Sequence, residues 1–570
     1  MHWIDWLVIG LYFAALVGVV WWSSRRQKTS KDYFLAGRNI GFFAVGASLF
    51  ASNIGSEHIV GLAGQGTSTG MAMAHWELHA WVMILLAWVF VPFYYRSGVY
   101  TMPEFLEQRF NSTVRWILSI VSLIAYVFTK VSVTVYAGAM VFQTLLPEAN
   151  FLGLNAFWVG ALSTVILTGI YTIFGGLRAV VYTDTAQAFI LLIGSFFITF
   201  FGLQQLGGWG ELQEICRQNA QQFALWRPNS DPDFPWLGIL IASPIIGIWY
   251  WCTDQYIVQR TLAAKNLQNS RRGAIWGGFL KVWPVMIFLV PGLIGYALHQ
   301  KGLINIPTEI KDGQTILVGD RVFPTMVSTL LPVGLRGLVV GGLLAALMSS
   351  LSSLFNSSAS LFTVDIYKKL HPTASEAALV HIGRIATTVI VGLGLLWIPI
   401  MPKIADGGLY QYLQSVQGYL APPITAVFLL GLFFKRVNAQ GAVAGLSLGF
   451  LAGMAKLTIQ GLVGAGKIVT QSSAAVENVI RNDTLYAIGN YNFLFASGWL
   501  LAISVFVIVA VSLLTKKPCE KQITNLTYAT ATPEQKLENR QSWNKWDVFA
   551  SVGVLGLVLA MYLYFSFWLQ

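Results

Sequence analysis

The sequence predicts an all-α protein that crosses a membrane many times. Of its 570 residues, 55% are hydrophobic and only 11% are charged, and the mean hydropathy is +0.62. This composition lies far outside that of soluble globular proteins. Apolar windows of about 20 residues, the length that a helix needs to span a bilayer, recur along the whole chain. Polar residues together with Gly or Pro interrupt two of these windows.

About fourteen spans are expected from these windows. Their starts lie near positions 3, 42, 76, 115, 153, 180, 236, 274, 336, 379, 409, 438, 491 and 546. The first window, MHWIDWLVIG, lacks the basic region of a signal peptide, so it is expected to remain as a span.

Positive charge predicts the orientation of these spans. The basic stretches lie on one side if the spans simply alternate; they are 25–38, 260–272, 435–436 and 516–545. Lys and Arg concentrate on cytoplasmic loops, so both termini are expected to be extracellular or periplasmic. Three longer polar stretches then lie outside as surface connections, at 204–234, 300–334 and 461–489.

Other classes of protein are disfavoured. The net charge of +11 is explained by basic cytoplasmic loops, so no nucleic-acid partner is expected. The three cysteines (Cys216, Cys252 and Cys519) form no disulfide framework and have no metal-ligand spacing. No zinc, phosphate-loop or dinucleotide motif occurs, and no enzyme is predicted.

The two interrupted windows predict a binding site inside the membrane. The first is SLFASNIGSEHIVG at 48–61, and the second is ASPIIGIWYWCTDQ at 242–255, five spans later. Proline removes a backbone donor and kinks a helix. Broken helices in matching positions of two halves are typical of inverted-repeat transporters, whose unwound backbone binds a cation and a substrate near the midplane.

A serine-rich stretch, AALMSSLSSLFNSSASLF at 345–362, has two interpretations. Small residues can serve close helix packing. Alternatively, the hydroxyls of Ser349 and Ser350 offer two oxygens to a hard cation.

Ionisable residues inside spans are candidates for function, although each can also pair with a neighbour inside the bundle. They are Glu57, His58, Glu77, His79, Lys130, Asp184, Asp254 and Lys281. No arginine is expected deep inside a span. An anionic substrate would be expected to need a guanidinium partner, so this favours a neutral one.

Motifs in order along nearly the whole chain resemble the sodium/solute symporter family, in particular its sodium–glucose cotransporter branch. They are DYFLAGR (Asp32–Arg38), ASLFASNIGSEHIVGLAG (Ala47–Gly64), TMPEFLEQRF (Thr101–Phe110), AVVYTDTAQ (Ala179–Gln187), WYWCTDQYIVQRTLAAKN (Trp249–Asn266), SSLSSLFNSSASLFTVDIY (Ser349–Tyr367) and PPITAVFLLGLFFKRVNAQGA (Pro422–Ala442).

The resemblance implies one transporter domain over 1–570 that takes up sugar with sodium by alternating access. It implies a LeuT-like core of two inverted five-helix repeats, at 42–203 and 236–434. An extra helix is expected at 1–24. Further helices are expected at 438–570, with a polar cytoplasmic linker at 516–545.

Residue roles follow from the same resemblance. The main sodium site matches the carbonyls of Ala51, Ile54 and Ala346 and the hydroxyls of Ser349 and Ser350. Sugar-contacting positions match Asn53, His58, Glu77, Lys281 and Gln414, with Tyr250 as the inner gate that stacks on the sugar and Trp251 beside it. Trp76 and Tyr410 match the outer cover. Asp184, Ser352 and Ser353 match a second sodium site, which implies two sodium ions per sugar.

One departure from the family pattern concerns selectivity. Gly247 stands where members have a side chain that can hydrogen-bond the sugar. A hexose is the expected substrate, and myo-inositol, another polyol or an anionic sugar stay open. Proton coupling and an uncoupled sensor or channel are further alternatives. The resemblance implies a cell (plasma or inner) membrane location and no obligate protein partner.

Overall fold

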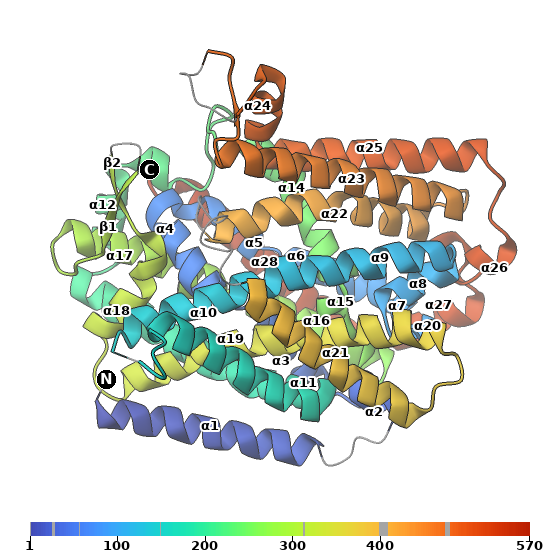
Figure 1. Cartoon of the computed structure of the whole chain (residues 1–570), viewed down its shortest axis with the longest axis horizontal. Coiled ribbons are helices and arrows are strands. Elements are labelled where there is room, and N and C mark those ends of the chain that lie inside the picture. Colours follow the sequence, from blue (N-terminus) through green and yellow to red (C-terminus); the bar gives the residue numbers. More distant parts are fainter. Residues whose placement is uncertain are drawn as a thin grey trace.

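The long helices run along one common direction, as predicted for a membrane protein (Figure 1). A computed structural model describes all residues except 1, 25–28, 56, 149, 312–313, 398–408 and 473–478. The side chains at 24, 57, 128–129, 311, 314–315, 397 and 409–412 are also outside this description. The only strands in the described part form two two-stranded sheets, β1–β2 (Thr308–Lys311 with Gln314–Leu317) and β3–β4 (Ile468–Val469 with Ile480–Arg481).

The membrane helices follow the predicted order. Among the described residues, 11 helices are long and apolar enough to span a bilayer, and three shorter apolar helices accompany them. The main elements are α1 (Trp3–Ser24), α3 (Phe42–Asn53), α4 (Ala63–Thr69), α5 (Ala74–Glu77), α6 (Ala80–Leu85), α7 (Val91–Ser97), α9 (Ser112–Ala125), α10 (Ser132–Leu145), α11 (Ala156–Leu206), α14 (Trp236–Ile248), α15 (Gln255–Leu262), α16 (Leu267–Lys281), α17 (Val290–Gln300), α18 (Val322–Leu330), α19 (Leu335–Ser360), α21 (Glu376–Trp397), α22 (Leu409–Phe433), α23 (Ala439–Gly464), α25 (Phe493–Leu514) and α28 (Lys545–Phe567).

Two of the expected spans are joined into one kinked helix. Two spans were expected from near 153 and 180, and the structure has one helix, α11, of 51 residues. Within it Gly176 adopts φ 52°, outside the helical range, so the helix is kinked there. A left-handed backbone suits glycine because it has no Cβ. The kink divides α11 between the two expected spans, and the total of fourteen stays a prediction.

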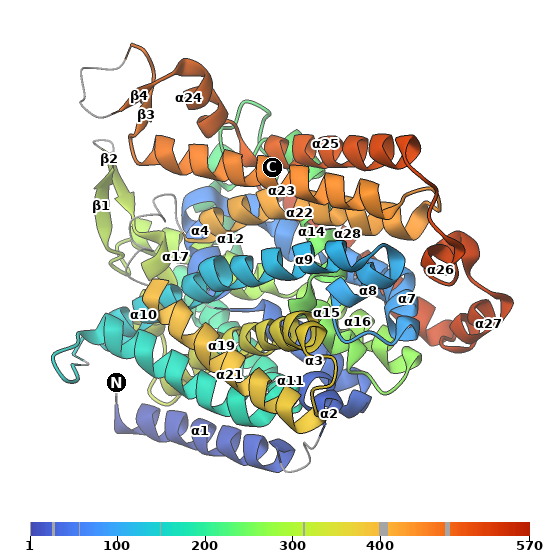
Figure 2. The same ribbon diagram turned by 45° about the vertical axis from the view of Figure 1, so that its right-hand side comes forward.

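The two ends of the helix bundle differ in character (Figures 1 and 2). One end, here called the loop end, carries α12 (Trp209–Arg217), β1, β2 and α24 (Asp483–Asn490), which belong to the three long polar stretches. The opposite end, here called the basic end, carries α8 (Met102–Arg109), α26 (Glu520–Ile523) and α27 (Pro533–Gln541). Both chain ends lie at the loop end in Figure 1, which agrees with the predicted alternation.

The structure confirms both predicted helix interruptions. α3 ends at Asn53, and the chain resumes as a π-helical segment at Glu57–Leu62. α14 continues through a π-helical segment at Trp249–Thr253, and Asp254 then adopts an extended backbone before α15 begins. The side chain of Asp254 caps α15 by accepting from the backbone N–H of Tyr256, as Asp does at many helix N-termini.

Candidate functional site

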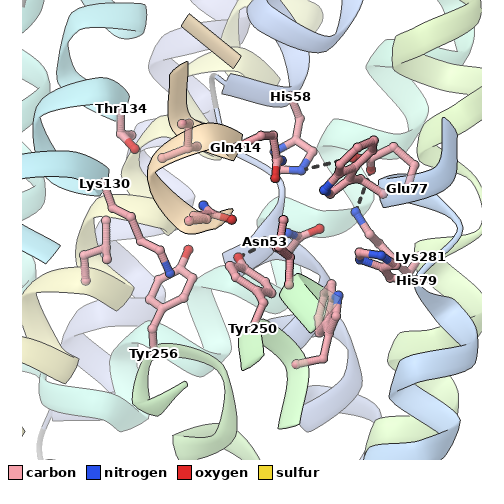
Figure 3. A pocket seen from close by; sticks show the side chains of 16 residues that line it. Asn53, His58, Glu77, His79, Lys130, Thr134, Tyr250, Tyr256, Lys281 and Gln414 are labelled. Atoms are coloured by element: carbon pink, nitrogen blue, oxygen red, sulfur yellow. Dashed lines mark hydrogen bonds and ion pairs between the residues drawn. The ribbon is translucent and has the colours of Figure 1, made fainter. Parts of the chain in front are cut away.

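A cavity lies between the two interrupted helices (Figure 3). Its space not filled by atoms, including its opening to solvent, is about 540 Å³. The residues that line it come from α3 to α5, η5 (Tyr126–Val131), α10, the α14–α15 region, α16, α19 and α22. They are Asn53, His58, Trp76, Glu77, His79, Lys130, Thr134, Ile246, Tyr250, Trp251, Tyr256, Lys281, Leu354, Leu413, Gln414 and Gln417.

A buried ion pair forms one side of the cavity. Lys281 Nζ lies 2.5 Å from Glu77 Oε2, and His58 Nε2 lies 3.5 Å from Glu77 Oε1. Glu77 and Lys281 are 0% and 1% exposed. A buried charge is tolerated when it is paired and hydrogen-bonded. The pair therefore supplies polar atoms to the cavity with little net charge.

Three buried polar atoms of the lining residues have no hydrogen-bond partner in the described part of the chain: Asn53 Oδ1, Gln414 Oε1 and Trp76 Nε1. The other end of the Asn53 amide donates to the Tyr250 hydroxyl at 3.1 Å. Buried polar atoms in folded proteins are nearly always paired. Two open acceptors and one open donor are therefore available to a bound ligand.

Aromatic rings bound the cavity on two sides. The rings of Tyr250 and Trp251 meet edge to face with centroids 5.1 Å apart. Trp76, on α5, packs edge to face against Phe234 at 6.3 Å. Tyr410 lies in the first turn of α22, but its side chain is outside the described part, so its predicted role stays untested.

His79 explains the unusual glycine at 247. A Cβ built on Gly247 would lie 3.1 Å from the His79 ring. The same ring contacts the Ser243 hydroxyl through Nε2 at 2.8 Å. His79 thus occupies the space that a side chain at position 247 would take, and it brings a polar ring to the cavity.

Sequence reasoning did not place several lining residues in the pocket. Two of them, His79 and Lys130, had been noted only as ionisable residues inside spans, and that signal was sufficient to find them. Gln417 follows Gln414 by one helical turn, so it shares the same face of α22. The further lining residues Thr134 and Tyr256 carried no sequence signal.

The end of α3 has carbonyls without their helical donors. Gly55 N donates to the Asn53 carbonyl at 3.1 Å, and His58 N donates to the Gly55 carbonyl at 3.1 Å. In a continuous helix these N–H groups would bond the carbonyls of Ala51 and Ile54. Both carbonyl groups belong to the predicted main sodium site, and hard cations prefer such oxygen ligands.

The serine-rich helix α19 meets this end of α3. Ser350 Oγ lies 3.4 Å from the Ser52 carbonyl oxygen, and Ala346 is one helical turn before Ser350. Ser349, expected at the same site, instead donates to Asp184 Oδ1 at 2.6 Å. The structure therefore brings Ser350 to the end of α3 and links Ser349 to the neighbouring carboxylate.

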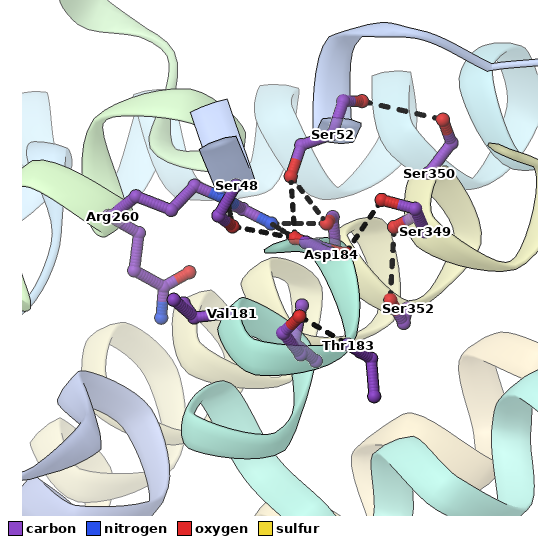
Figure 4. A network of polar contacts seen from close by, with 12 residues as sticks. Ser48, Ser52, Val181, Thr183, Asp184, Arg260, Ser349, Ser350 and Ser352 are labelled. Carbon is purple, nitrogen blue, oxygen red and sulfur yellow. Dashed lines mark hydrogen bonds and ion pairs between the residues drawn. The ribbon is translucent and has the colours of Figure 1, made fainter. Parts of the chain in front are cut away.

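Asp184, on α11, is the centre of a buried network (Figure 4). Its Oδ2 accepts from Ser48 Oγ at 2.6 Å and from Ser52 Oγ at 3.1 Å. Ser353 Oγ lies 2.9 Å from Ser52 Oγ and so joins the network. Ser352 Oγ donates to the Ser349 carbonyl at 3.0 Å, so Ser352 reaches Asp184 only through the Ser349 residue.

A buried arginine lies beside this network, although it is outside the candidate membrane spans, where no arginine was expected. Arg260 is 0% exposed, and its guanidinium lies 3.9 Å from Asp184 Oδ2 and contacts Ser353 Oγ. The sequence placed Arg260 in a loop, whereas it lies near the end of α15, a half-helix that is buried among other helices. The cavity lining nevertheless contains no arginine among the described residues.

The sequence of this chain is similar to those of known sodium-coupled transporters. Residues 33–449 match the model of the "Sodium:solute symporter family". The chain is 38% identical over 556 residues to sodium/glucose cotransporter 1 of Ovis aries, covering 93% of this chain and 81% of that protein. It is 37% identical over 556 residues to the sodium/myo-inositol cotransporter of Homo sapiens, covering 92% and 75%.

The fold is also similar to that of a solved structure, the substrate-bound outward-open state of a Na⁺-coupled sialic acid symporter. The TM-score is 0.72 at 22% sequence identity, and the match covers 90% of this chain and 99% of that one.

Proposed function

This chain belongs to the sodium:solute symporter family, and we propose that it imports a neutral hexose of the glucose or galactose type with sodium, by alternating access. Its curated relatives are membrane transporters of sugars or related polyols coupled to sodium, which makes it a transporter rather than an enzyme. The fold is the LeuT-like one that the sequence predicted. The observation that carries the hexose proposal is the set of unpartnered polar atoms in the cavity.

The chemistry of the cavity suits a neutral polyol. A sugar hydroxyl both donates and accepts hydrogen bonds. Asn53 Oδ1 and Gln414 Oε1 would accept from such hydroxyls, and Trp76 Nε1 would donate to one. The ring of Tyr250, with Trp251 beside it, would cover the apolar C–H face of the sugar.

Sodium is the proposed second substrate. Carbonyl oxygens of Ala51, Ile54 and Ala346, with the Ser350 and Ser349 hydroxyls, would supply its ligands. The freed carbonyls of α3 support this assignment. Ser349 would have to turn from Asp184, its partner at 2.6 Å, toward the ion.

We further propose a second sodium ion at Asp184, Ser352 and Ser353. At about 100 mV one charge that moves inward gains about 2.3 kcal/mol, and a tenfold sodium gradient adds about 1.4 kcal/mol. One ion then supports roughly several hundred-fold accumulation of sugar and two ions roughly 10⁵-fold. Because Arg260 lies beside Asp184, this second ion would have to displace the guanidinium or share the carboxylate with it.

The proposed orientation follows the positive charge. The basic end would face the cytoplasm of a cell (plasma or inner) membrane, and both chain ends would lie outside. The repeats at 42–203 and 236–434 would form the moving core, and we propose no obligate protein partner.

A second candidate substrate is myo-inositol, because one relative of similar identity is named a sodium/myo-inositol cotransporter. This polyol would use the same acceptors and donor. An anionic sugar fits less well, because the described lining offers no arginine for a bidentate contact.

The test is uptake of labelled glucose and galactose into proteoliposomes that hold the purified protein. An inward sodium gradient is compared with an equal potassium gradient, with the membrane potential held inside-negative. We expect accumulation with sodium only, its loss in Lys281→Ala, and slower uptake at low sugar concentration in Gln414→Ala. If neither hexose accumulates with sodium, the hexose proposal is wrong. A panel with myo-inositol and anionic sugars then tests the second candidate, and a proton gradient tests proton coupling.

A further inference from the structure

A second buried lysine–carboxylate pair borders the cavity, on the side opposite Lys281 and Glu77 (Figure 3). Lys130 Nζ lies 2.7 Å from Asp254 Oδ2, and the two residues are 7% and 4% exposed. Lys130 belongs to the π-helical segment between α9 and α10, and Asp254 belongs to the interruption before α15. The pair therefore joins two helices that are distant in the sequence.

Aromatic rings surround the ammonium group of Lys130. It lies 4.6 Å from the ring centroid of Tyr250 and 4.5 Å from that of Tyr256. The rings of Trp249 and Tyr126 follow at 5.2 and 5.3 Å. A cation over an aromatic face is attracted by the ring quadrupole, most strongly where water is excluded. The position of Tyr250, the proposed stacking partner of the sugar, is thus tied to Lys130.

Asp254 connects the same cluster to the proposed sodium site. Besides Lys130, it accepts from the backbone N–H of Tyr256 at 3.3 Å and contacts the Tyr126 hydroxyl. The Tyr256 hydroxyl in turn contacts the carbonyl of Ser52. Ser350 approaches that same carbonyl. A movement of Asp254 would therefore shift Tyr256 and, through it, the Ser52 carbonyl at the end of α3, where sodium is proposed to bind.

The pair lies on the route from the cavity to the basic end. Lys130 lines the cavity, and Gln255, which follows Asp254, accepts from the backbone N–H of Met102 at the start of α8 at 2.8 Å. Tyr126 and Tyr256, at 1% and 2% exposure, fill the space around the pair. Solvent therefore reaches very little of this cluster.

We propose that the Lys130–Asp254 pair is a latch that closes the cavity toward the basic end, and that it must separate before sugar and sodium leave on that side. Lys130 is a positioning residue, because it acts through Tyr250 and Asp254. This inference rests on the proposed function for its role in transport, but the closure itself can be measured without any substrate.

The test compares Lys130→Met with two controls. Lys130→Arg keeps the charge. Arg115→Met breaks another buried pair, on the adjoining helix α9, since Arg115 Nε lies 2.7 Å from Asp365 Oδ1, and it does not touch the cavity. If Lys130→Met does not fold, a double variant with Asp254→Asn leaves no unpaired buried charge and serves the same comparison.

Native cysteines report the closure. Cys252 is buried two residues before Asp254, and Cys216 is equally buried in α12 at the loop end. In a Cys519→Ser background, alkylation by N-ethylmaleimide at each position is followed by mass spectrometry. We expect Lys130→Met to raise the rate at Cys252 by about tenfold, as for a tenfold rise in the open population. Cys216 should not change, and Lys130→Arg and Arg115→Met should behave like the wild type at Cys252.

Sodium-free efflux of labelled glucose from loaded proteoliposomes gives the transport readout. Lys130→Met should raise it by a similar factor. Equal labelling of Cys252 in all variants, or a parallel rise at Cys216, would overturn the latch and leave the pair as a packing contact. If the wild type transports no hexose but the Cys252 result holds, the proposed substrate fails and the latch stands.

Discussion

The cavity and the Asp184 network are both buried and polar, but their groups are paired to different degrees. In the cavity, Asn53 Oδ1, Gln414 Oε1 and Trp76 Nε1 have no partner in the described part of the chain. In the network, Asp184 accepts from three serine hydroxyls, and a guanidinium lies 3.9 Å away.

This difference indicates different roles in stability. A buried polar atom without a partner destabilises the folded protein by about 1–3 kcal/mol. A ligand that hydrogen-bonds these cavity atoms would therefore remove this destabilisation. The network already stabilises the folded protein, and a cation that enters it must compete with internal partners. Substitutions in the cavity should therefore lower affinity, and substitutions in the network should lower stability.

The largest effect is expected for Asp184→Ala. It leaves the buried Arg260 without its carboxylate, and breaking a buried pair in this way costs about 3–5 kcal/mol. Thermal unfolding followed by size-exclusion chromatography should show a large fall in the melting temperature. The double variant Asp184→Asn, Arg260→Gln should recover much of it without restoring sodium-dependent uptake. An unchanged melting temperature in Asp184→Ala would contradict the idea that the network, unlike the cavity, stabilises the folded protein.

Effects of intermediate size are expected at two buried glutamines. One has an oxygen in the cavity that is unpaired among the described residues, and the other is fully hydrogen-bonded elsewhere in the protein. Gln414→Ala removes an open acceptor, so it should raise the KM for sugar by about 5- to 30-fold, equivalent to 1–2 kcal/mol, without lowering the melting temperature. Gln259 is fully engaged, with bonds to Phe34 O, Ser360 Oγ and Ser357 Oγ. Gln259→Ala should lower the melting temperature and leave KM unchanged. Uptake kinetics and thermal unfolding are measured on both variants. A lower melting temperature in Gln414→Ala together with a higher KM in Gln259→Ala would contradict the prediction.

Ser352→Ala tests whether a second sodium ion binds in the Asp184 network. Its hydroxyl donates to the Ser349 carbonyl at 3.0 Å and also hydrogen-bonds with Tyr171, so its loss should lower stability by about 1–2 kcal/mol. If a second sodium ion binds there, the charge moved per sugar should fall from two to one. Parallel measurement of current and labelled sugar gives this ratio, and an unchanged ratio would count against the second ion.

The smallest effect is expected at Glu107, in α8 at the basic end and outside both regions. Burial would raise the pKa of Glu107, but hydrogen bonds from Lys369, Arg115 and Ser112 outweigh it and lower the pKa to about 2. A carboxylate with a lowered pKa stabilises the folded state above its unfolded pKa, and this stability is lost as pH falls through the folded value. The melting temperature of the wild type should fall more steeply than that of Glu107→Gln between about pH 4.5 and 2. If the melting temperatures of both proteins fall equally with pH, the interactions of Glu107 contribute nothing to this pH dependence.

The sequence was sufficient where the signal is local. Apolar windows identified the helices, and Asn53 marked the first interruption, because hydropathy and backbone breakers act within a few residues. In the second interrupted window, α14 continues through Pro244 and the break falls at Asp254. The resemblance assigned Asn53, Glu77, Tyr250, Lys281 and Gln414 to one pocket, and all of them line the cavity.

Other features depended on contacts that no local pattern encodes. His79 fills the space beside Gly247 because two helices approach closely there. Arg260 is buried although its surroundings in the sequence are polar, because the half-helix α15 is enclosed by neighbours.

The sequence by itself thus determined which segments are helices, where they break and which chemical groups lie inside the membrane. Only the tertiary structure decided how those groups are paired. Ser349 bonds Asp184 across 165 residues, and Lys130 meets Asp254 across 124. The physical reason is that hydropathy is a sum over neighbouring residues, whereas a hydrogen bond or an ion pair depends on a distance of a few ångströms between atoms that only folding brings together.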